Sequence, residues 1–287
     1  MASRPRFAWC NGRIVPYGEA AVPLDDRGLQ FGESLYEVLP ITKGIPRLLP
    51  EHVSRMTRGA TELGLETGVP SLTVWEALIR DLVEREGLGD ALLYAQVTGG
   101  ATPREHAPAV DVAKTFFAYL MPFVYPGDSE VAAGIAAISL PDIRWGRRDL
   151  KTTMLLAAVL AKKEARRRGA AEAVLVGPNG EVYEGASSNV FIVEGRSLVT
   201  PEQTTNLLPG TMRGLVVDVA REAGLDCRGE PFDLGRLRRA DEVLVTSTSQ
   251  LVMPVVALDG VPIGPGTAGP VGRHLAKRLR ERFDLPG

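Results

Sequence analysis

The chain has 287 residues, of which 45% are hydrophobic and 24% are charged, as is ordinary for a globular protein, and the length favours about two domains. A net charge of −2 gives no reason to expect a nucleic-acid or membrane partner. The two cysteines, Cys10 and Cys227, are too few for a disulfide framework, and no segment is typical of a signal peptide or a membrane span, so we expect a cytoplasmic protein.

The first third of the sequence has a mixed α/β pattern. Residues 7–15 are typical of a hairpin that turns at Asn11-Gly12, and the strand expected at Ser34–Thr42 is followed by a turn. Apolar residues at helical spacing predict two helices, and strand-forming residues predict two further strands. These helices are expected at 50–63 and Leu72–Glu86, and the strands at Ala91–Thr98 and 115–121.

Residues 122–130 are the best candidate for a linker, because proline and glycine interrupt them. We therefore expect a smaller N-terminal α/β domain over 1–121 and a larger C-terminal α/β domain over 131–287. A hairpin turn is expected in the larger domain at residues 177–180. The other elements expected there are strands at 131–139, 173–176, 181–193 and 241–246 and helices at 152–168, 211–223 and 269–283.

Two residues of the C-terminal half carry chemistry that one class of cofactor needs together. Lys151 lies just ahead of an Ala/Leu-rich helix, and Glu184 lies at the end of a predicted hairpin. Pyridoxal phosphate (PLP) enzymes need a lysine that forms a Schiff base with the cofactor and a carboxylate that pairs with its ring nitrogen. Taken singly, each residue is equally compatible with a solvated surface position.

A phosphate group needs backbone amides, hydroxyls and a cation, and the sequence offers all three. The helix expected at Thr211 and Met212 opens with N–H groups that suit an anion. Hydroxyls are available at the end of a strand, in Ser247, Thr248 and Ser249, and Arg55 is a candidate cation. An ordinary helix start, a polar strand end and a solvated arginine are the alternatives.

Arg104 and His106 are two residues apart in a polar stretch after a predicted strand. If that stretch is extended, both side chains point the same way and can hold a carboxylate together. Tyr36, in the strand at Ser34–Thr42, is a candidate third contact. A polar loop and a core tyrosine remain the alternatives at this point.

Residues 25–38, Asp-Asp-Arg-Gly-Leu-Gln-Phe-Gly-Glu-Ser-Leu-Tyr-Glu-Val, resemble the opening motif of the fold-type IV PLP aminotransferases. That class includes branched-chain aminotransferases, D-amino-acid aminotransferases and aminodeoxychorismate lyase. The remaining motifs are matched in order by residues 142–151, 184–191, 210–213 and 245–254. The resemblance implies an α/β fold of two domains, with PLP in the interdomain cleft.

Within that class, residues 94–106 are most similar to the D-amino-acid aminotransferases. The resemblance implies transamination between a D-amino acid, such as D-alanine or D-glutamate, and a 2-oxo acid, such as pyruvate or 2-oxoglutarate. It also implies that Arg104 and His106 reach into the active site of a partner subunit, so that a homodimer with shared sites is needed.

The resemblance assigns roles to individual residues, with Lys151 as the catalytic lysine and Glu184 as the partner of the ring nitrogen. The expected cofactor-binding residues are Lys151, Glu184, Arg55, Leu208, Thr211, Met212, Ser247, Thr248, Ser188 and Asn189. The expected substrate-binding residues are Tyr36, Arg104, His106, Val38 and Ser249, and no metal ligand is expected.

The chain departs from the family pattern at four positions, which are Met212 in place of a threonine, Ala186 in place of a serine, Pro40 within a strand, and Gly99, where a side chain is common. Two alternatives stay open. One is an (R)-amine or branched-chain L-amino-acid aminotransferase on the same fold, which would lack the carboxylate contact of Arg104 and His106. The other is a PLP-binding protein without turnover.

Overall fold

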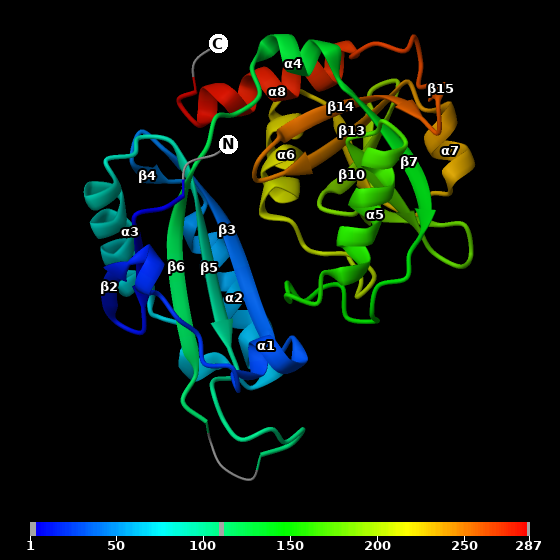
Figure 1. Ribbon diagram of the computed structural model, residues 1–287. Coiled ribbons are helices and arrows are strands. Elements are labelled where there is room, and N and C mark those ends of the chain that lie inside the picture. The colour runs from blue at the N-terminus through cyan, green and yellow to red at the C-terminus, as the bar shows by residue number, and fades with distance from the viewer. Residues whose placement is uncertain (1–3, 109–111, 286–287) are drawn as a thin grey trace. The chain divides into compact units, whose positions relative to one another are not determined.

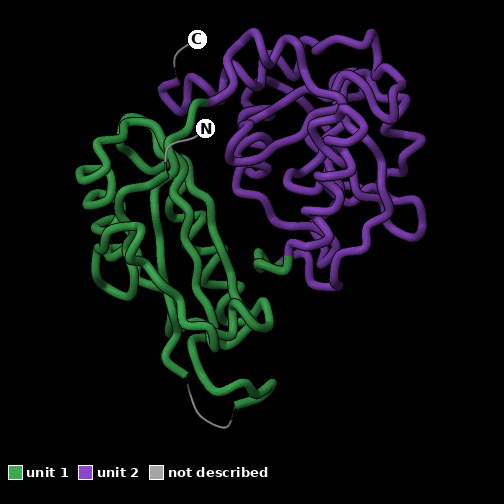
Figure 2. The backbone as a smooth tube through the Cα atoms, viewed as in Figure 1, with its two compact units in different colours: residues 1–124, 150–154 green, residues 125–149, 155–287 purple. Residues whose placement is uncertain are grey.

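The computed structural model describes residues 4–108 and 112–285, and the chain forms two compact units (Figures 1 and 2). Unit 1 comprises residues 1–124 and 150–154, and unit 2 comprises residues 125–149 and 155–287. The chain first passes from unit 1 to unit 2 after Val124, within the stretch 122–130. Residues 150–154 belong to unit 1 again, which the division based on the sequence did not include. No helix in the described ranges is both long and apolar enough to cross a membrane.

Unit 1 is built on a six-stranded antiparallel sheet in the order β2-β1-β6-β5-β3-β4. Asn11 and Gly12 both have positive φ, which a tight turn between β1 and β2 requires. The strands are β1 (Phe7–Cys10), β2 (Arg13–Pro16), β3 (Ser34–Thr42), β4 (Ile45–Pro46), β5 (Ala91–Thr98) and β6 (Thr115–Pro122). The helices are α1 (Arg27–Phe31), α2 (Leu49–Leu63) and α3 (Leu72–Glu86), with short 3₁₀ turns at Tyr17–Glu19 and Glu66–Gly68.

The two faces of this sheet differ in chemistry. One face is covered by α2, which packs on β3, and by α3, which packs on β1 and β6. Its cross-strand rows are almost fully buried and include Leu35, Leu39, Leu93, Ala95, Val97, Ala118 and Leu120. The opposite face carries half-buried residues, Tyr36 and Val38 on β3 among them. The alternation of side chains along β3 therefore separates a packed core from a face that is available for a site.

A short extended segment pairs with the edge of β3 that β4 leaves free. The N–H of Tyr36 donates to the carbonyl of Lys151 at 3.0 Å, and Thr152 forms a bridge with Leu35. The helix expected at 152–168 is therefore wrong at its start. Helix α5 (Leu156–Arg167) begins four residues later, because the backbone of residues 151–153 is engaged with β3.

Unit 2 is built on a nine-stranded mixed sheet, and β9 at one end of it also contacts β10 (Figure 1). The sheet order is β12-β11-β10-β13-β14-β7-β8-β9, with β15 paired to β14. The strands are β7 (Ile135–Pro141), β8 (Glu172–Val176), β9 (Val182–Gly185), β10 (Asn189–Glu194), β11 (Ser197–Thr200), β12 (Asp226–Gly229), β13 (Glu242–Ser247), β14 (Leu251–Leu258) and β15 (Val261–Pro262). Besides α5, the helices are α4 (Asp128–Ala133), α6 (Thr211–Glu222), α7 (Leu234–Arg239) and α8 (Pro270–Arg282).

Two strands expected in unit 2 differ from the structure. Residues 131–133 of the strand expected at 131–139 belong to α4 instead, and β7 begins at Ile135. Glu130 accepts a hydrogen bond from the Gly127 N–H and so caps this helix. The strand expected at 181–193 is two strands, β9 and β10. Between them the Gly185 N–H donates to the Ser188 carbonyl, which closes a tight turn. This turn brings the end of β9 beside the start of β10.

Candidate active site

Lys151 lies on the edge segment of unit 1, beside β3. Its Nζ is 4.3 Å from the centroid of the Tyr36 ring, and its carbonyl is held by the Tyr36 N–H. Among the described residues, the amine makes no hydrogen bond and no ion pair. The backbone therefore fixes the position of Lys151, while the electron pair of its amine stays available for chemistry once a proton has left.

The face of the sheet that carries Tyr36 is lined with aromatic rings. Tyr36 stacks on Tyr94 with ring centroids 5.7 Å apart, and Tyr94 stacks on Tyr119 at 5.2 Å. Val38 lies on the same face, directly opposite Tyr94 in the register of β3 and β5. Burial raises the pKa of the Tyr94 hydroxyl, which therefore stays neutral. The Lys151 amine thus meets a surface that is aromatic and uncharged.

Arg55, on α2, is held by a buried carboxylate on β3. Its Nε and Nη2 donate to the two carboxylate oxygens of Glu37 at 2.8 and 2.6 Å, and Nδ1 of His52 lies 2.6 Å from Glu37 Oε2. Burial alone would raise the pKa of Glu37, but the charges of Arg55 and His52 outweigh it and lower the pKa to about 2. Glu37 is therefore anionic at neutral pH and fixes the plane of the Arg55 guanidinium.

Arg104 and His106 are both exposed, and both lie against one ring. The Arg104 guanidinium is 4.9 Å from the centroid of Phe31, and the His106 ring is 5.2 Å from it. The structure therefore brings the two side chains together. No hydrogen bond or ring contact joins either of them to Tyr36 within the described ranges, so a grip by all three residues stays a prediction.

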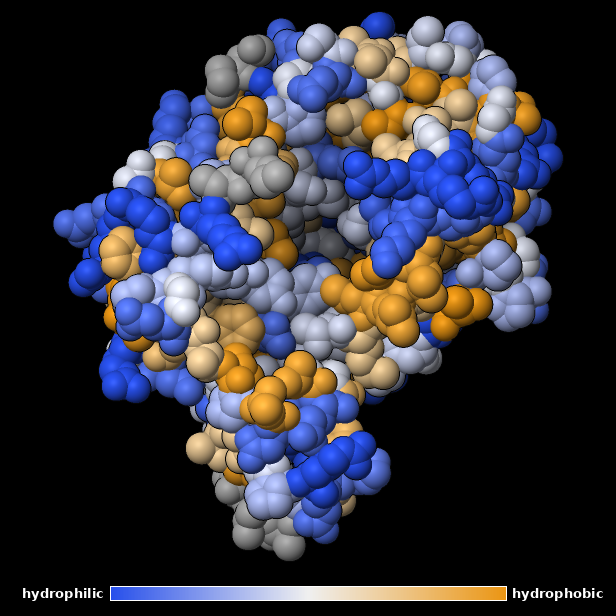
Figure 3. Space-filling model, viewed as in Figure 1, coloured by the Kyte–Doolittle hydropathy of each residue, from blue (hydrophilic) through white to orange (hydrophobic). Residues whose placement is uncertain are grey.

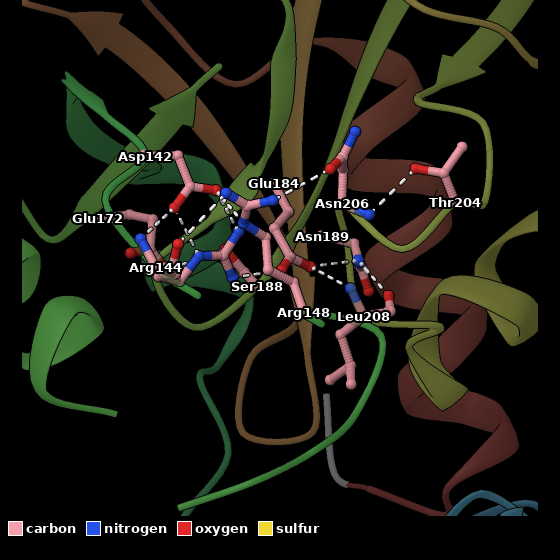
Figure 4. A network of polar contacts seen from close by, with 10 residues as sticks. All are labelled: Asp142, Arg144, Arg148, Glu172, Glu184, Ser188, Asn189, Thr204, Asn206 and Leu208. Atoms are coloured by element: carbon pink, nitrogen blue, oxygen red, sulfur yellow. Dashed lines mark hydrogen bonds and ion pairs between the residues drawn. The ribbon is translucent and has the colours of Figure 1, made fainter. Parts of the chain in front are cut away.

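In unit 2, Glu184 is buried at the end of β9 and fully engaged (Figure 4). One carboxylate oxygen forms an ion pair with Arg144 at 2.5 Å. The other accepts hydrogen bonds from the Asn189 side chain at 3.1 Å and from the Leu208 N–H at 3.0 Å. These donors and the arginine charge favour the ionised carboxylate and fix its orientation.

Arg144 is in turn held by an ion pair with Asp142, in the loop that follows β7 (Figure 4). Asp142 pairs with Arg144 at 2.8 Å and with Arg148 at 3.0 Å. Burial would lower the pKa of Arg144, but its hydrogen bond with Asp142 and the charge of Glu184 raise it. The carboxylate of Glu184 therefore belongs to a buried chain of alternating charges, and Arg147 and Arg148 are paired with acids of the same loop.

The start of α6 has the properties of an anion site. Its N-cap is Gly210, which contributes no side-chain cap, and a Cβ there would lie 2.0 Å from Asn189 Oδ1. The side chain of Met212 is buried, so this residue offers its backbone amide and no polar side-chain group. In the turn between β13 and β14, Ser247 and Ser249 approach each other at 3.3 Å. The half-buried Thr248 hydroxyl has no partner among the described residues.

Ser188, expected at the cofactor, donates its hydroxyl to the buried Glu172 at 2.9 Å. Ser187 donates to the same carboxylate oxygen at 3.1 Å. Together they stabilise the turn between β9 and β10, which carries Glu184 on one side and Asn189 on the other. Ser188 therefore supports the turn in this structure, and a direct contact of Ser188 with the cofactor stays a prediction.

Four residues of these networks were not singled out from the sequence, which are Glu37, His52, Asp142 and Arg144. His52 and Arg55 are three residues apart on a predicted helix, so both lie on one face of it. This spacing was the signal in the sequence that could have pointed to His52. No comparable signal pointed to Arg144, because its partner Glu184 is 40 residues away.

Comparisons with known proteins agree with these observations. The family model described as Amino-transferase class IV matches residues 34–258. D-alanine aminotransferase of Bacillus licheniformis is 36% identical over 270 residues, which are 94% of each chain. D-alanine aminotransferase of Staphylococcus haemolyticus is 36% identical over 278 residues, which are 96% of each chain.

Among solved structures, the branched-chain amino acid aminotransferase of Escherichia coli matches with a TM-score of 0.90 at 25% identity and covers 98% of this chain and 95% of its own. That of Thermoproteus uzoniensis, solved with norvaline, matches with a TM-score of 0.87 at 23% identity and covers 98% and 95%, which shows the fold. This chain belongs to the family of class IV aminotransferases.

Proposed function

We propose that this protein is a PLP-dependent aminotransferase that moves an amino group between a D-amino acid, such as D-alanine, and a 2-oxo acid. The observation that carries this proposal is the similarity, over nearly the whole length, to D-alanine aminotransferases. The geometry supports it independently, because Arg104 and His106 lie together on Phe31 and offer a carboxylate two donors.

The residues present fit PLP in each of its parts. An amine without a polar partner, Lys151, suits the aldehyde, and a buried anion, Glu184, suits the ring nitrogen. The α6 N-terminus without a side-chain cap and the Thr248 hydroxyl suit the phosphate, with Arg55 as the predicted cation. Packing of Leu208 on the ring and a contact of Ser249 with the substrate stay predictions. The location of PLP in the interdomain cleft also stays a prediction.

When bound, PLP carries the amino group and withdraws electrons from the reacting substrate carbon. Lys151 Nζ is the group that we assign to the proton transfer, first as base and then as acid. Tyr36 and the edge of β3 restrict where that amine can lie. Glu184, held by Arg144 and Asn189, keeps a negative charge in one place, and Glu37 keeps Arg55 oriented.

The substrate assignment is tested by Arg104→Ala, with Arg13→Ala as the matched control, since Arg13 is an exposed arginine elsewhere in unit 1. We expect kcat/KM for D-alanine to fall by about ten- to a hundredfold, because a charge-assisted hydrogen bond is lost. The rate with (R)-1-phenylethylamine, which has no carboxylate, should change far less. Equal losses with both donors would mean that Arg104 has a structural role. Preference for L-leucine over all D-amino acids would favour a branched-chain enzyme instead.

A second copy of the chain is the partner that we propose. Helix α5 buries Ala158, Ala161 and Ala165 and leaves an apolar stripe exposed. Leu156, Val159 and Leu160 are 73%, 43% and 49% exposed, and Figure 3 shows an apolar patch where α5 lies. An apolar helix face of this kind is typical of a subunit interface. The cytoplasm stays the predicted location.

Shared active sites are tested by co-expressing Lys151→Ala and Arg104→Ala chains with different affinity tags and purifying the mixed dimer. If Arg104 serves the partner's site, one of the two sites in the mixed dimer has both residues intact. The mixed dimer should then show about half of the wild-type rate with D-alanine. If Arg104 serves its own chain, one site lacks Lys151 and the other lacks Arg104, and the rate should be about half that of the Arg104→Ala protein.

A further inference from the structure

Arg27 ties the segment that carries Arg104 and His106 to helix α1. Its side chain is almost fully buried, although it is a charged residue. Nη1 donates to the carbonyl of Glu105 at 2.6 Å, and Nη2 donates to the carbonyl of His106 at 2.9 Å. The backbone adds another hydrogen bond, from the Arg27 N–H to the Gly100 carbonyl at 2.9 Å. One residue therefore holds this segment at both of its ends.

A single ring, that of Phe31 at the end of α1, supports the side chains of the same segment. The Arg27 guanidinium lies 5.0 Å from its centroid, the Arg104 guanidinium 4.9 Å, and the His106 ring 5.2 Å. Cation–ring contacts restrict the orientation of an arginine without consuming its N–H donors. Phe31 therefore fixes Arg104 and leaves its hydrogen-bonding edge available.

The charges on this platform are unequal. Arg27 is neutralised by Glu33, which accepts from its Nε at 2.6 Å. Arg104 has no acidic partner in the part of the chain that the structure describes. Two arginines thus share one ring, but only Arg104 offers an uncompensated positive charge to an incoming anion.

Gly99 is explained by the same arrangement. A Cβ at this position would lie 2.8 Å from Glu33 Oε1 and 3.1 Å from the Arg27 Cβ. A side chain there would push the carboxylate away from Arg27. Glycine at position 99 therefore leaves room for the Glu33 carboxylate where it pairs with Arg27.

We propose that Arg27 is a positioning residue for substrate specificity, which presets Arg104 and His106 for the substrate carboxylate through the carbonyls of residues 105 and 106 and the Phe31 platform. Arg27 acts through the segment that it holds and does not itself contact the substrate. This inference rests on the proposed function, because it takes the ligand of Arg104 and His106 to be the carboxylate of an amino acid.

The test uses the full-length enzyme loaded with PLP and compares Arg27→Lys with Arg13→Lys. Lysine keeps the charge beside Glu33, but its single ammonium group cannot serve the carboxylate and two carbonyls in the planar geometry of a guanidinium. We expect KM for D-alanine to rise by about tenfold or more, because charge-assisted hydrogen bonds that hold the segment are lost, while kcat changes much less. Phe31→Leu should shift KM in the same direction.

Two further measurements separate positioning from general damage. The first is the single-turnover rate with D-alaninamide, which has no carboxylate; it should be the same in Arg27→Lys and wild type, as should the visible absorption of bound PLP. The second is the rate of trypsin cleavage after Arg104, followed by mass spectrometry. Cleavage should be faster in Arg27→Lys than in wild type and unchanged in Arg13→Lys, because the segment is no longer held.

The inference is wrong if Arg27→Lys leaves KM for D-alanine unchanged, whether or not cleavage accelerates. It is also wrong if D-alanine and D-alaninamide lose rate equally, since Arg27 would then support the fold or the cofactor site. The Arg104→Ala variant separates this failure from failure of the proposed function. If Arg104→Ala also treats both donors alike, the substrate carboxylate is bound elsewhere.

Discussion

Lys151 and Glu184, the two residues to which we assign the central chemistry, have opposite surroundings. The Lys151 amine lies over Tyr36 and has no hydrogen-bond or ion-pair partner among the described residues. Glu184 is saturated, with Arg144 on one oxygen and Asn189 and a backbone N–H on the other. The first belongs to unit 1 and the second to unit 2.

The contrast between Lys151 and Glu184 matches the roles that we propose for them. A residue that gives and takes protons in each cycle cannot be locked in a strong ion pair, because every transfer would have to break it. A residue that supplies a constant negative charge benefits from being locked, because a preorganised charge needs no rearrangement during the reaction. The sequence places both residues in similar polar contexts, and only the structure shows the difference.

The largest effect is expected from Lys151→Ala, which removes the amine that has no hydrogen-bond or ion-pair partner among the described residues. Turnover with D-alanine should fall by at least about 10²–10⁴-fold, the range typical of a lost general acid–base. Steady-state rates measured with PLP in excess check this prediction. Lys151→Arg should not restore turnover, because a guanidinium does not release its proton near neutral pH. An alanine variant with nearly full activity would show that another residue moves the proton.

The next largest effect, on stability, is expected at Glu37, the carboxylate of unit 1 that is hydrogen-bonded to Arg55 and His52. Glu37→Gln should destabilise the protein by about 3 kcal/mol at pH 7, because Arg55 loses its buried partner. The pKa of Glu37 is lowered from 4.5 to about 2, so its contribution is fully present above pH 4.5 and is lost as the pH falls towards 2. The gap between wild type and variant should therefore shrink below about pH 4.5.

Urea unfolding followed by tryptophan fluorescence, at neutral pH and near pH 3.5, measures this gap. Glu84→Gln, at an exposed position on α3, is the control and should show little change at either pH. A gap for Glu37→Gln that stays constant between the two pH values would contradict the assignment of a low pKa to Glu37.

A smaller effect is expected from Arg144→Gln, which loosens Glu184 without touching it chemically. The rate of the first half-reaction should fall by roughly tenfold, because one charge-assisted bond to Glu184 is lost. PLP should still bind. Arg147→Gln, in the same loop but paired with Asp149, should leave the rate unchanged. If both variants react at the wild-type rate, the reaction does not depend on the ion pair between Arg144 and Glu184. The contrast with Lys151 then has no functional meaning.

Much of the fold follows from local sequence. Helix α3 and strands β3 and β5 have the predicted bounds, because periodicity and turn residues define them without help from distant parts of the chain. The helix start at 152 was wrong because Thr152 pairs with Leu35, a contact across more than a hundred residues. The strand at 131 was wrong because the cap by Glu130 outweighed the apolar pattern.

Roles for Lys151 and Glu184 could be predicted because the motifs around them are contiguous, and these roles stay predictions. The residues that tune them could not, since Arg144, Glu37 and Arg27 act through partners that only folding brings close. Gly99 is the instructive example. It is a departure from the family pattern, and only the structure shows that the Arg27–Glu33 pair lies beside it and that a Cβ there would crowd the Glu33 carboxylate.

The central claim, that this is an aminotransferase for D-amino acids, is tested most directly by a single-turnover experiment on the wild-type enzyme loaded with PLP. The absorption spectrum is recorded after mixing with D-alanine, L-leucine or (R)-1-phenylethylamine, and the oxo product is identified. We predict that D-alanine converts the bound cofactor to its amine form fastest and yields pyruvate. Faster conversion by L-leucine than by any D-amino acid, or no conversion by any amino donor, would contradict the claim.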